Sequence, residues 1–423
     1  MSDLALLGGP KAMDSVEDGD MFRWPIITAE DEEAVLAVLR RGAMSGTDVT
    51  RKFEEDLCAY FSLPYALCHN TGTAAIQAAM WACGVRRGDE VICQSMTYWG
   101  SALQVFSLGA TVVFGEMDPK TLTLDPADIE ARITDRTKAI VVVHYSAYPT
   151  DMDPIMEIAQ RRGIKVIEDV SHAQGGFYKG RLLGTIGDVG AMSIMSGKSL
   201  PCGEGGFLVT QNQQLYERAV SFGHYQRSFE VEDPELTPFQ GMPLGGYKYR
   251  MHQLSSAVGR VQLKHYNARM ETIQQAMNYF WDQMEGVPGV KAHRPAANSG
   301  STMGGWYAAK GLYVAEELGG LPVARFCEAV NAEGGSFRLL PGANILMHLH
   351  PVLNDADIYG DGKPTRIAHS DRDLRQREGS LPVTESLPGR CMSIPWFKHF
   401  RPEIIDAYVG AFRKVAERAE ELL

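Results

Sequence analysis

The stretch Tyr65-Ala-Leu-Cys-His-Asn-Thr-Gly72-Thr73-Ala-Ala-Ile-Gln-Ala-Ala-Met-Trp-Ala-Cys83 joins a short apolar run to a helical pattern through a glycine turn. Further apolar runs follow it, separated from one another by stretches of helical character. Strands that are apolar throughout and alternate with helices indicate an α/β fold, with a mostly parallel sheet covered on both faces. The expected strands are 65–68, 91–93, 111–114, 139–143 and 165–167, and the expected helices between them are 73–83, 99–108, 126–133 and 154–162.

The residues on either side of this alternation predict two domains. We expect a large domain at 1–255, which begins with helices at 29–41 and 49–61 and includes further apolar runs at 189–194 and 206–210. A bridging helix at 252–284 then leads into a smaller α+β C-terminal domain, so that the second unit covers 256–423. The elements expected in it are an apolar run at 306–314, helices at 322–332 and 402–422, and a loop rich in Asp, Gly and Arg at 354–378.

Composition excludes several classes of protein. The 423 residues carry 41 Lys and Arg against 52 Asp and Glu, a formal net charge of -11. Such an acidic chain is not expected to bind nucleic acid or an anionic membrane, although a local basic pocket could still hold an anionic small molecule. Seven dispersed cysteines without CxxC spacing predict reduced thiols, no metal site and a cytoplasmic protein. The N-terminal apolar run of four residues is too short for a signal peptide, and no apolar run is long enough to span a membrane.

One lysine and one aspartate carry the strongest chemical signal. Asp169 follows the apolar run at 165–168, and Lys198 lies about thirty residues later in Ser193-Ile-Met-Ser-Gly-Lys198-Ser-Leu. A partly desolvated lysine that forms a Schiff base, and a strand-end carboxylate that keeps a pyridine nitrogen protonated, are what pyridoxal 5'-phosphate (PLP) requires. Taken singly, Asp169 could be a helix cap and Lys198 a surface lysine. A P-loop around Lys198 is excluded, because Met192 stands where that motif needs glycine.

Three further segments would meet the same end of a parallel sheet, where ligands of such folds bind. Gly72 and Thr73 open a helix whose N-terminus favours a phosphate, although Thr71 or Thr73 could serve only as its N-cap. Tyr98 could stack on a pyridine ring, or simply pack in the core. His172 could contact the phenolic oxygen of the cofactor, or be a structural histidine. All of these signals occur in the chain order that a PLP site needs.

At these residues the chain resembles the DegT/DnrJ/EryC1/StrS family of PLP-dependent sugar and cyclitol aminotransferases. The resemblance implies a type I aminotransferase fold, with a large PLP domain and a smaller C-terminal domain. It also implies an obligate homodimer whose active sites lie at the interface. The segments that carry the resemblance include Asn70-Thr-Gly-Thr-Ala-Ala, Gly88-Asp-Glu-Val-Ile, Ile167-Glu-Asp169, Gly203-Glu-Gly-Gly206 and Gly246-Tyr-Lys-Tyr-Arg-Met251.

Site residues follow from the resemblance position by position. Lys198 and Asp169 match the catalytic lysine and the partner of the pyridinium. His172 matches the contact to the ring oxygen. The remaining matches are Gly72, Thr73 and Ser193 for the phosphate and Tyr98 for ring stacking.

Two positions depart from the pattern of the family. Lys248 stands where relatives commonly have an asparagine that reaches the phosphate of the other subunit's cofactor. Lysine could make this contact as a charge, or the contact could be lost. Tyr145-Ser-Ala-Tyr148 replaces a segment that usually contains glycine, which could reshape the substrate pocket. The retained Lys198 favours transamination over deoxygenation, in which relatives carry histidine instead.

The expected reaction moves an amino group from glutamine or glutamate to a keto-cyclitol such as scyllo-inosose, or to a keto-sugar, for amino-sugar or aminocyclitol antibiotic assembly. The segments Met195-Ser-Gly-Lys-Ser-Leu and Asp169-Val-Ser-His favour the cyclitol. The main alternative is a nucleotide-linked keto-sugar as acceptor. A PLP-dependent sugar dehydratase and a non-catalytic PLP-binding regulator stay open as further alternatives.

Overall fold

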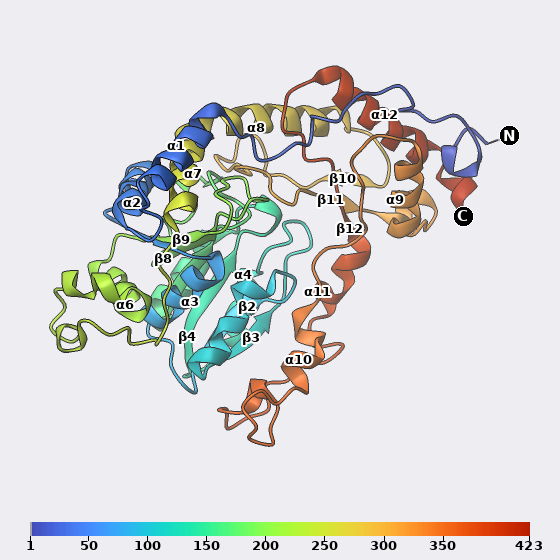
Figure 1. Cartoon of the computed structure of the whole chain (residues 1–423). Helices are drawn as coiled ribbons and strands as arrows, with labels where there is room; N and C mark the ends of the chain where they lie inside the picture. The colour runs from blue at the N-terminus through green and yellow to red at the C-terminus, as the bar shows by residue number, and fades with distance from the viewer. Residues whose placement is uncertain (1) are drawn as a thin grey trace.

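The computed structural model describes residues 2–423 and is built around a seven-stranded sheet (Figure 1). The strand order is β1-β9-β8-β5-β4-β2-β3. Only β9 runs against its neighbours β1 and β8, so the sheet is mostly parallel, as predicted. The strands are β1 (Tyr65–His69), β2 (Glu90–Gln94), β3 (Thr111–Gly115), β4 (Thr137–Val143), β5 (Lys165–Asp169), β8 (Val189–Ser193) and β9 (Gly206–Thr210).

Both faces of this sheet are buried, which explains why its strands are apolar at successive positions. Ile140 and Val142 of β4 belong to one hydrophobic core, together with Ile155. Val141 belongs to the other core, together with Ala75. Because successive side chains of a strand point to opposite faces, neither face can be polar. The covering helices are α3 (Gly72–Ala82), α4 (Pro126–Arg132), α5 (Met152–Arg162) and α6 (Gln213–Gly223).

Two expected helices differ from the structure. The segment 99–108 forms two short 3-10 helices, Trp99–Ser101 and Leu103–Leu108, because Ala102 leaves helical geometry with φ -131°. The bridging helix predicted at 252–284 is likewise broken into α7 (Gln253–Lys264) and α8 (Tyr266–Gln283). At the junction Tyr266 is turned inward, where its hydroxyl donates to Gln174 O at 2.8 Å. Apolar spacing persists through the break, so the pattern alone could not reveal it.

A second, three-stranded antiparallel sheet lies in the C-terminal part of the chain. Of the apolar run predicted at 306–314, only β11 is a strand, because Trp306 and Ala308 both adopt left-handed backbone with φ 56°. The predicted division at residue 255 falls inside α7 and stays a prediction. The elements of this part are β10 (Val290–Ala292), β11 (Lys310–Tyr313), β12 (Cys391–Ser393), α9 (Val323–Ala332), α10 (Pro351–Asn354), α11 (Pro382–Ser386) and α12 (Pro402–Glu417).

The N-terminal residues cross the molecule and pack on this C-terminal part, so that both chain ends lie beside α12 (Figure 1). The backbone N–H groups of Ala5 and Ala12 both donate to the buried carboxylate of Glu333, each at 2.9 Å. Asp18 accepts a bond from Ser336 N at 2.9 Å. The chain then returns to the large sheet through α1 (Ala29–Arg40) and α2 (Asp48–Phe61).

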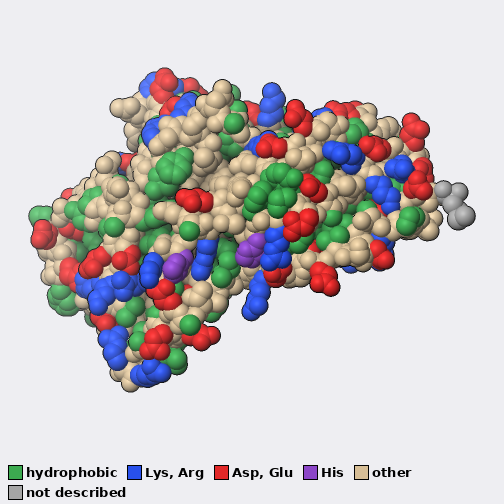
Figure 2. Space-filling view, turned by 90° about the horizontal axis from the view of Figure 1, so that it is seen from above, with side chains coloured by type: hydrophobic (Ala, Val, Ile, Leu, Met, Phe, Trp, Pro, Cys, Tyr) green, Lys and Arg blue, Asp and Glu red, His purple; other side chains and the backbone are tan. Residues whose placement is uncertain are grey.

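Charged side chains of both signs are interspersed over the face seen from above (Figure 2). Within residues 2–423, no helix combines the length and the apolar character that crossing a membrane requires. The same residues contain no group of three or more His, Cys, Asp or Glu side chains arranged to hold a metal ion.

Candidate active site

A cavity of about 690 Å³ lies at the carboxyl ends of the parallel strands. Asp169 is the last residue of β5 and Ser193 the last residue of β8, so the sheet itself brings both to the cavity wall. Other walls come from the 71–73 turn, from the loop that carries Lys198 and from the C-terminal part of the chain. The lining residues include Gly72, Thr73, Tyr98, Ser101, Asp169, His172, Ser193, Lys198, Glu204, Tyr307 and Asn344.

Lys198 is 7% exposed, and its amine lies over the ring of Tyr307, with Nζ 4.0 Å from the ring centroid. Burial lowers the pKa of this lysine to about 8, although the nearby Asp169 carboxylate opposes the shift. A buried ammonium loses hydration, so the neutral amine is favoured. Lys198 is therefore prepared to react as a nucleophile and as a base.

The backbone around Lys198 is held by Gln174. The Gln174 side-chain carbonyl accepts bonds from Ser199 Oγ at 2.8 Å and from Leu200 N at 3.1 Å. Its amide group donates to Ser193 O at 2.6 Å. One side chain thus ties the lysine loop to the end of β8.

Asp169 is fixed by two hydrogen bonds inside the cavity wall. Ser101 Oγ donates to Oδ2 at 2.7 Å, and Ser171 N donates to Oδ1 at 3.0 Å. The carboxylate is nearly fully buried and has no lysine or arginine partner among the described residues. A protonated pyridine nitrogen would supply the positive partner that the Asp169 carboxylate lacks.

The turn at 71–73 is shaped to hold a phosphate. Thr71 Oγ1 accepts from Ala74 N at 3.0 Å, so Thr71 is the N-cap, as one alternative predicted. Thr73 is thereby left to line the cavity. A Cβ added to Gly72 would lie 2.5 Å from the Ser193 Cβ, so only glycine allows the helix N-terminus to approach β8. Backbone N–H groups and hydroxyls at a helix N-terminus are the usual phosphate ligands.

His172 presents a hydrogen-bond donor to the cavity. Its Nδ1 accepts a bond from Ser146 N at 3.2 Å. Burial, together with the charge of Lys198, holds the pKa of His172 well below its usual range. We therefore infer that the ring is neutral and carries its proton on Nε2. Ser146 and the following Ala147 have left-handed backbone, with φ 49° and 69°, in the segment where glycine is usual.

Of the two remaining predicted site residues, Tyr98 reaches the cavity and Lys248 does not. Tyr98 lines the cavity and stays half exposed. Lys248 is exposed and lines a separate small hollow with Thr47 and Arg250, so within one chain it does not reach the cavity.

The amine, the buried carboxylate, the phosphate turn and the histidine donor together fit PLP. Sequence reasoning missed the residues that support this set, because a serine, glutamine or tyrosine distant in the chain carries no motif of its own. Tyr307 is marked only in the structure, where Trp306 and Ala308 on either side of it have left-handed backbone. The missed residues are Ser101, Gln174, Tyr307 and Asn344, and Glu204 was identified only within Gly203-Glu-Gly-Gly206 and given no site role.

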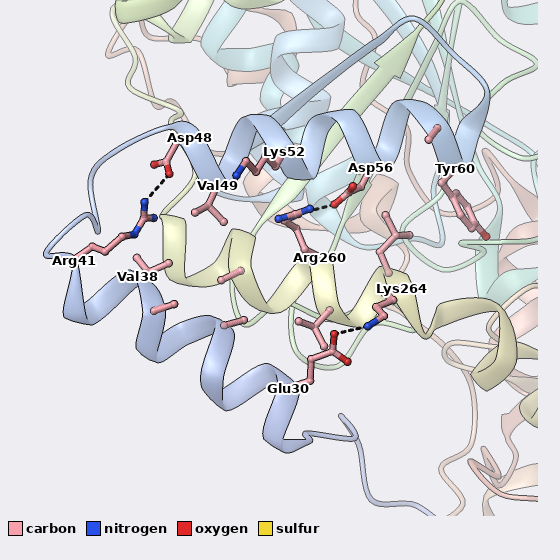
Figure 3. A pocket seen from close by; sticks show the side chains of 16 residues that line it. Glu30, Val38, Arg41, Asp48, Val49, Lys52, Asp56, Tyr60, Arg260 and Lys264 are labelled. Atoms are coloured by element: carbon pink, nitrogen blue, oxygen red, sulfur yellow. Dashed lines mark hydrogen bonds and ion pairs between the residues drawn. The ribbon is translucent and has the colours of Figure 1, made fainter.

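A second hollow of about 720 Å³ lies between α1, α2 and α7, and Figure 3 shows its apolar floor and charged rim. Its rim is crossed by three ion pairs. It contains no buried lysine and lies on helices rather than at strand ends, so we do not regard it as the catalytic cavity. The pairs are Glu30–Lys264 at 2.6 Å, Arg41–Asp48 at 3.0 Å and Asp56–Arg260 at 2.6 Å.

Comparison with known proteins agrees with this site. The DegT/DnrJ/EryC1/StrS aminotransferase family matches residues 25–413. L-glutamine:scyllo-inosose aminotransferase of Streptomyces griseus is 31% identical over 435 residues, which cover 100% of this chain and 99% of that protein. The X-ray structure of the aminotransferase from Psychrobacter cryohalolentis has a TM-score of 0.80 and 27% identity, over 94% of this chain and 99% of that chain. DesI, crystallised in the presence of its TDP-sugar product, has a TM-score of 0.78 and 25% identity, over 100% and 98%. The expected type I aminotransferase fold is thereby confirmed.

Proposed function

Because the chain belongs to the DegT/DnrJ/EryC1/StrS family and is a PLP-dependent sugar or cyclitol aminotransferase, we propose that it transfers the amino group of glutamine or glutamate to an uncharged keto-cyclitol. A keto-cyclitol of the scyllo-inosose type would place the reaction in amino-sugar or aminocyclitol biosynthesis.

The charge of the cavity wall carries this choice of acceptor. Lys198 is the only lysine or arginine among the residues that line the cavity, whereas Asp169 and Glu204 supply carboxylates. A nucleotide-linked sugar brings a diphosphate, which proteins usually bind with arginine or lysine. A polyol instead needs hydrogen-bond acceptors and donors, which Glu204 and Asn344 provide. The full-length likeness to a scyllo-inosose aminotransferase supports the same choice.

The likeness to DesI supports the alternative acceptor, a nucleotide-linked keto-sugar. In that case the cations for the diphosphate would have to come from outside this cavity. Lys248 and Arg250 are exposed or half-buried on another part of the chain and could supply them from a second subunit.

We further propose a homodimer with shared active sites. Lys248 lies outside the cavity of its own chain, so only a second copy could bring it to the phosphate. Its ammonium would then add a charge to a phosphate site that otherwise consists of backbone N–H groups and hydroxyls.

When bound, PLP supplies an aldehyde that takes up the amino group and a ring that delocalises the electron pair left on the donor Cα. The Lys198 amine is the base that removes the proton from this Cα, and it returns a proton to the carbon of the acceptor. Burial around Lys198 excludes water from the proton transfer. The groups that would hold the cofactor are Asp169 at the ring nitrogen, His172 at the phenolic oxygen, Tyr98 over the ring and Gly72, Thr73 and Ser193 at the phosphate.

The test is a screen of amino donors and keto acceptors on the PLP-loaded protein. The visible absorption band of the bound cofactor is the readout. We expect glutamine or glutamate to bleach the band and scyllo-inosose to restore it. Lys198→Ala, the control, should show neither change. Glu204→Gln should keep bleaching by the amino donor but raise the half-saturating concentration of the cyclitol about tenfold, because a neutral amide binds hydroxyls less strongly than a carboxylate.

Each other outcome points to a different function. Restoration only by a nucleotide-linked keto-sugar would overturn the proposed acceptor. Loss of a sugar hydroxyl without amine transfer would favour the dehydratase, and a band that neither donor bleaches would favour the regulator.

A further inference from the structure

Lys198 receives a hydrogen bond from a residue that lies far from it in the sequence. The indole Nε1–H of Trp24 donates to the backbone carbonyl of Lys198 at 2.8 Å. No other hydrogen bond reaches this oxygen from residues 2–423. Trp24 packs against Trp396 with ring centroids 6.0 Å apart, so the indole is held in place from its other side.

Three further polar groups of the lysine loop have partners on the same side of the molecule. Lys198 N donates to Met195 O at 2.8 Å, and Gln174 binds both Ser199 Oγ and Leu200 N. Unlike these groups, the Lys198 carbonyl takes its partner from the N-terminal segment that precedes α1. Without that partner, the peptide after Lys198 would turn in search of another donor, because a carbonyl shielded from water is costly to leave unpaired.

The segment that carries Trp24 is itself anchored to the C-terminal part of the chain. Met21 O accepts from Lys398 N at 3.0 Å, and the Asp20 carboxylate pairs with Arg401 at 2.6 Å. These contacts hold the backbone next to Trp24 in one position relative to the C-terminal part.

We propose that Trp24 is a positioning residue for the reacting amine: its indole N–H fixes the peptide of Lys198 and so keeps Nζ over Tyr307. Trp24 acts through Lys198, because it is absent from the residues that line the cavity. A lysine whose backbone is free to turn would reach the cavity in several orientations, and catalysis falls steeply when a reacting group leaves its productive geometry.

The test separates the N–H group from the bulk of the ring. Trp24→Phe removes the donor and part of the ring, whereas 3-benzothienylalanine at position 24 keeps the shape and removes only the N–H. Trp281→Phe is the control: Trp281 is buried where Trp24 is half-buried, and its indole N–H has no acceptor within residues 2–423.

Two readouts use the protein without cofactor. Indole 15N NMR of the six tryptophans should show a Trp24 signal that is protected from exchange and is lost in Trp24→Phe. The pH profile for modification of Lys198 by an amine-directed reagent should have its midpoint near 8 and move upward by about one pH unit in both position-24 variants, because the amine becomes more solvated.

A third readout uses the loaded protein. Both position-24 variants should slow the half-reaction with the amino donor at least tenfold, while the half-saturating donor concentration stays within twofold. Trp281→Phe should change neither the pH profile nor the rate. Equal effects of Trp24→Phe and Trp281→Phe, or wild-type behaviour of the benzothienylalanine protein, would overturn the proposal. If Trp24→Phe does not fold, the comparison of the isosteric benzothienylalanine protein with the wild type tests the proposal by itself.

Discussion

At the scale of single residues, the site depends on a conflict between burial and charge at Lys198. Burial of the Lys198 amine costs folding free energy, but it favours the neutral form, and only a neutral amine attacks a carbonyl. At pH 7.5 a lysine with a pKa of about 8 is roughly 200-fold richer in free amine than an ordinary lysine. The direction of the Lys198 pKa shift also determines how the stability of the protein depends on pH. Since the folded-state pKa lies below the ordinary value of 10.5, Lys198 opposes folding at neutral pH, and this cost disappears as pH rises from 8 to 10.5.

We therefore expect the protein without cofactor to capture PLP faster as pH rises, with a midpoint near 8. Stopped-flow absorbance of the visible band measures this rate. Lys198→Ala should form no such band. A midpoint near 10 would show that the amine is solvated and would contradict the burial argument.

Ser101 should matter through Asp169, because its hydroxyl donates to the buried carboxylate at 2.7 Å. We expect Ser101→Ala to reduce kcat about tenfold and to weaken cofactor retention, since the carboxylate loses one of its two fixed donors. Asp169→Asn should be far more damaging, because it removes the charge itself. Dialysis of the loaded variants, followed by the residual visible absorbance, compares them. An unchanged Ser101→Ala protein would show that Ser171 N alone orients Asp169.

At the scale of elements, the sequence predicted the parallel strands and most helices well because their signals are local. The strands are buried on two faces, and helices such as α5 end at a glycine in left-handed backbone, Gly163. The failures are equally physical. The break at His265 accompanies the inward turn of Tyr266, whose hydroxyl bonds to Gln174 O across the fold. The 3-10 pieces at 99–108 are divided at Ala102, which leaves helical geometry. The sequence could place Lys198 and Asp169 at one cavity because the pair of residue types is rare at that spacing, and their catalytic roles stay a prediction. Ser101, Gln174 and Trp24 carry no such local signal, because they reach the site only through contacts across the fold.

Helix α2 offers a test of local backbone strain. It ends at Ser62, an exposed residue in left-handed backbone with φ 53° and ψ 39°. Glycine adopts this conformation without a Cβ penalty, so Ser62→Gly should raise the free energy of unfolding by about 0.5–1 kcal/mol. Urea unfolding of the cofactor-free protein gives the value. Ser62→Ala, the control, keeps the Cβ and should bring no gain, and activity should stay unchanged in both.

At the scale of the whole molecule, several histidines are buried in the neutral form. Burial lowers the pKa of His69 and His293 to about 4 and holds those of His172 and His224 well below the usual range. A histidine whose folded-state pKa lies below its unfolded value costs no stability above pH 6.5, where it is neutral in both states, and lowers stability as pH falls from 6.5 towards 4.

We expect the free energy of unfolding to fall between pH 7.5 and pH 5, by about 2 kcal/mol for His293 alone. His293→Gln should flatten this dependence, because its amide can still donate to Thr121 O but does not titrate. Urea titrations of the cofactor-free protein at the two pH values provide the comparison. A pH dependence that His293→Gln leaves intact would place its origin in other groups.

The docking of the N-terminal residues on Glu333, Ser336 and Lys398 has a consequence for how the molecule is made. A ribosome releases residues 4–24 first, but their binding surface is among the last parts to emerge, roughly 20–80 s later at 5–20 residues per second. Throughout this interval the large sheet can assemble while the peptide of Lys198 lacks its indole partner. Translation that stops before residue 396 would leave a chain with every cavity-lining side chain present but without Trp396 and Lys398, which hold the Trp24 segment in place. If Trp24 positions the lysine as proposed, competence for catalysis is in this way coupled to synthesis of the C-terminal part.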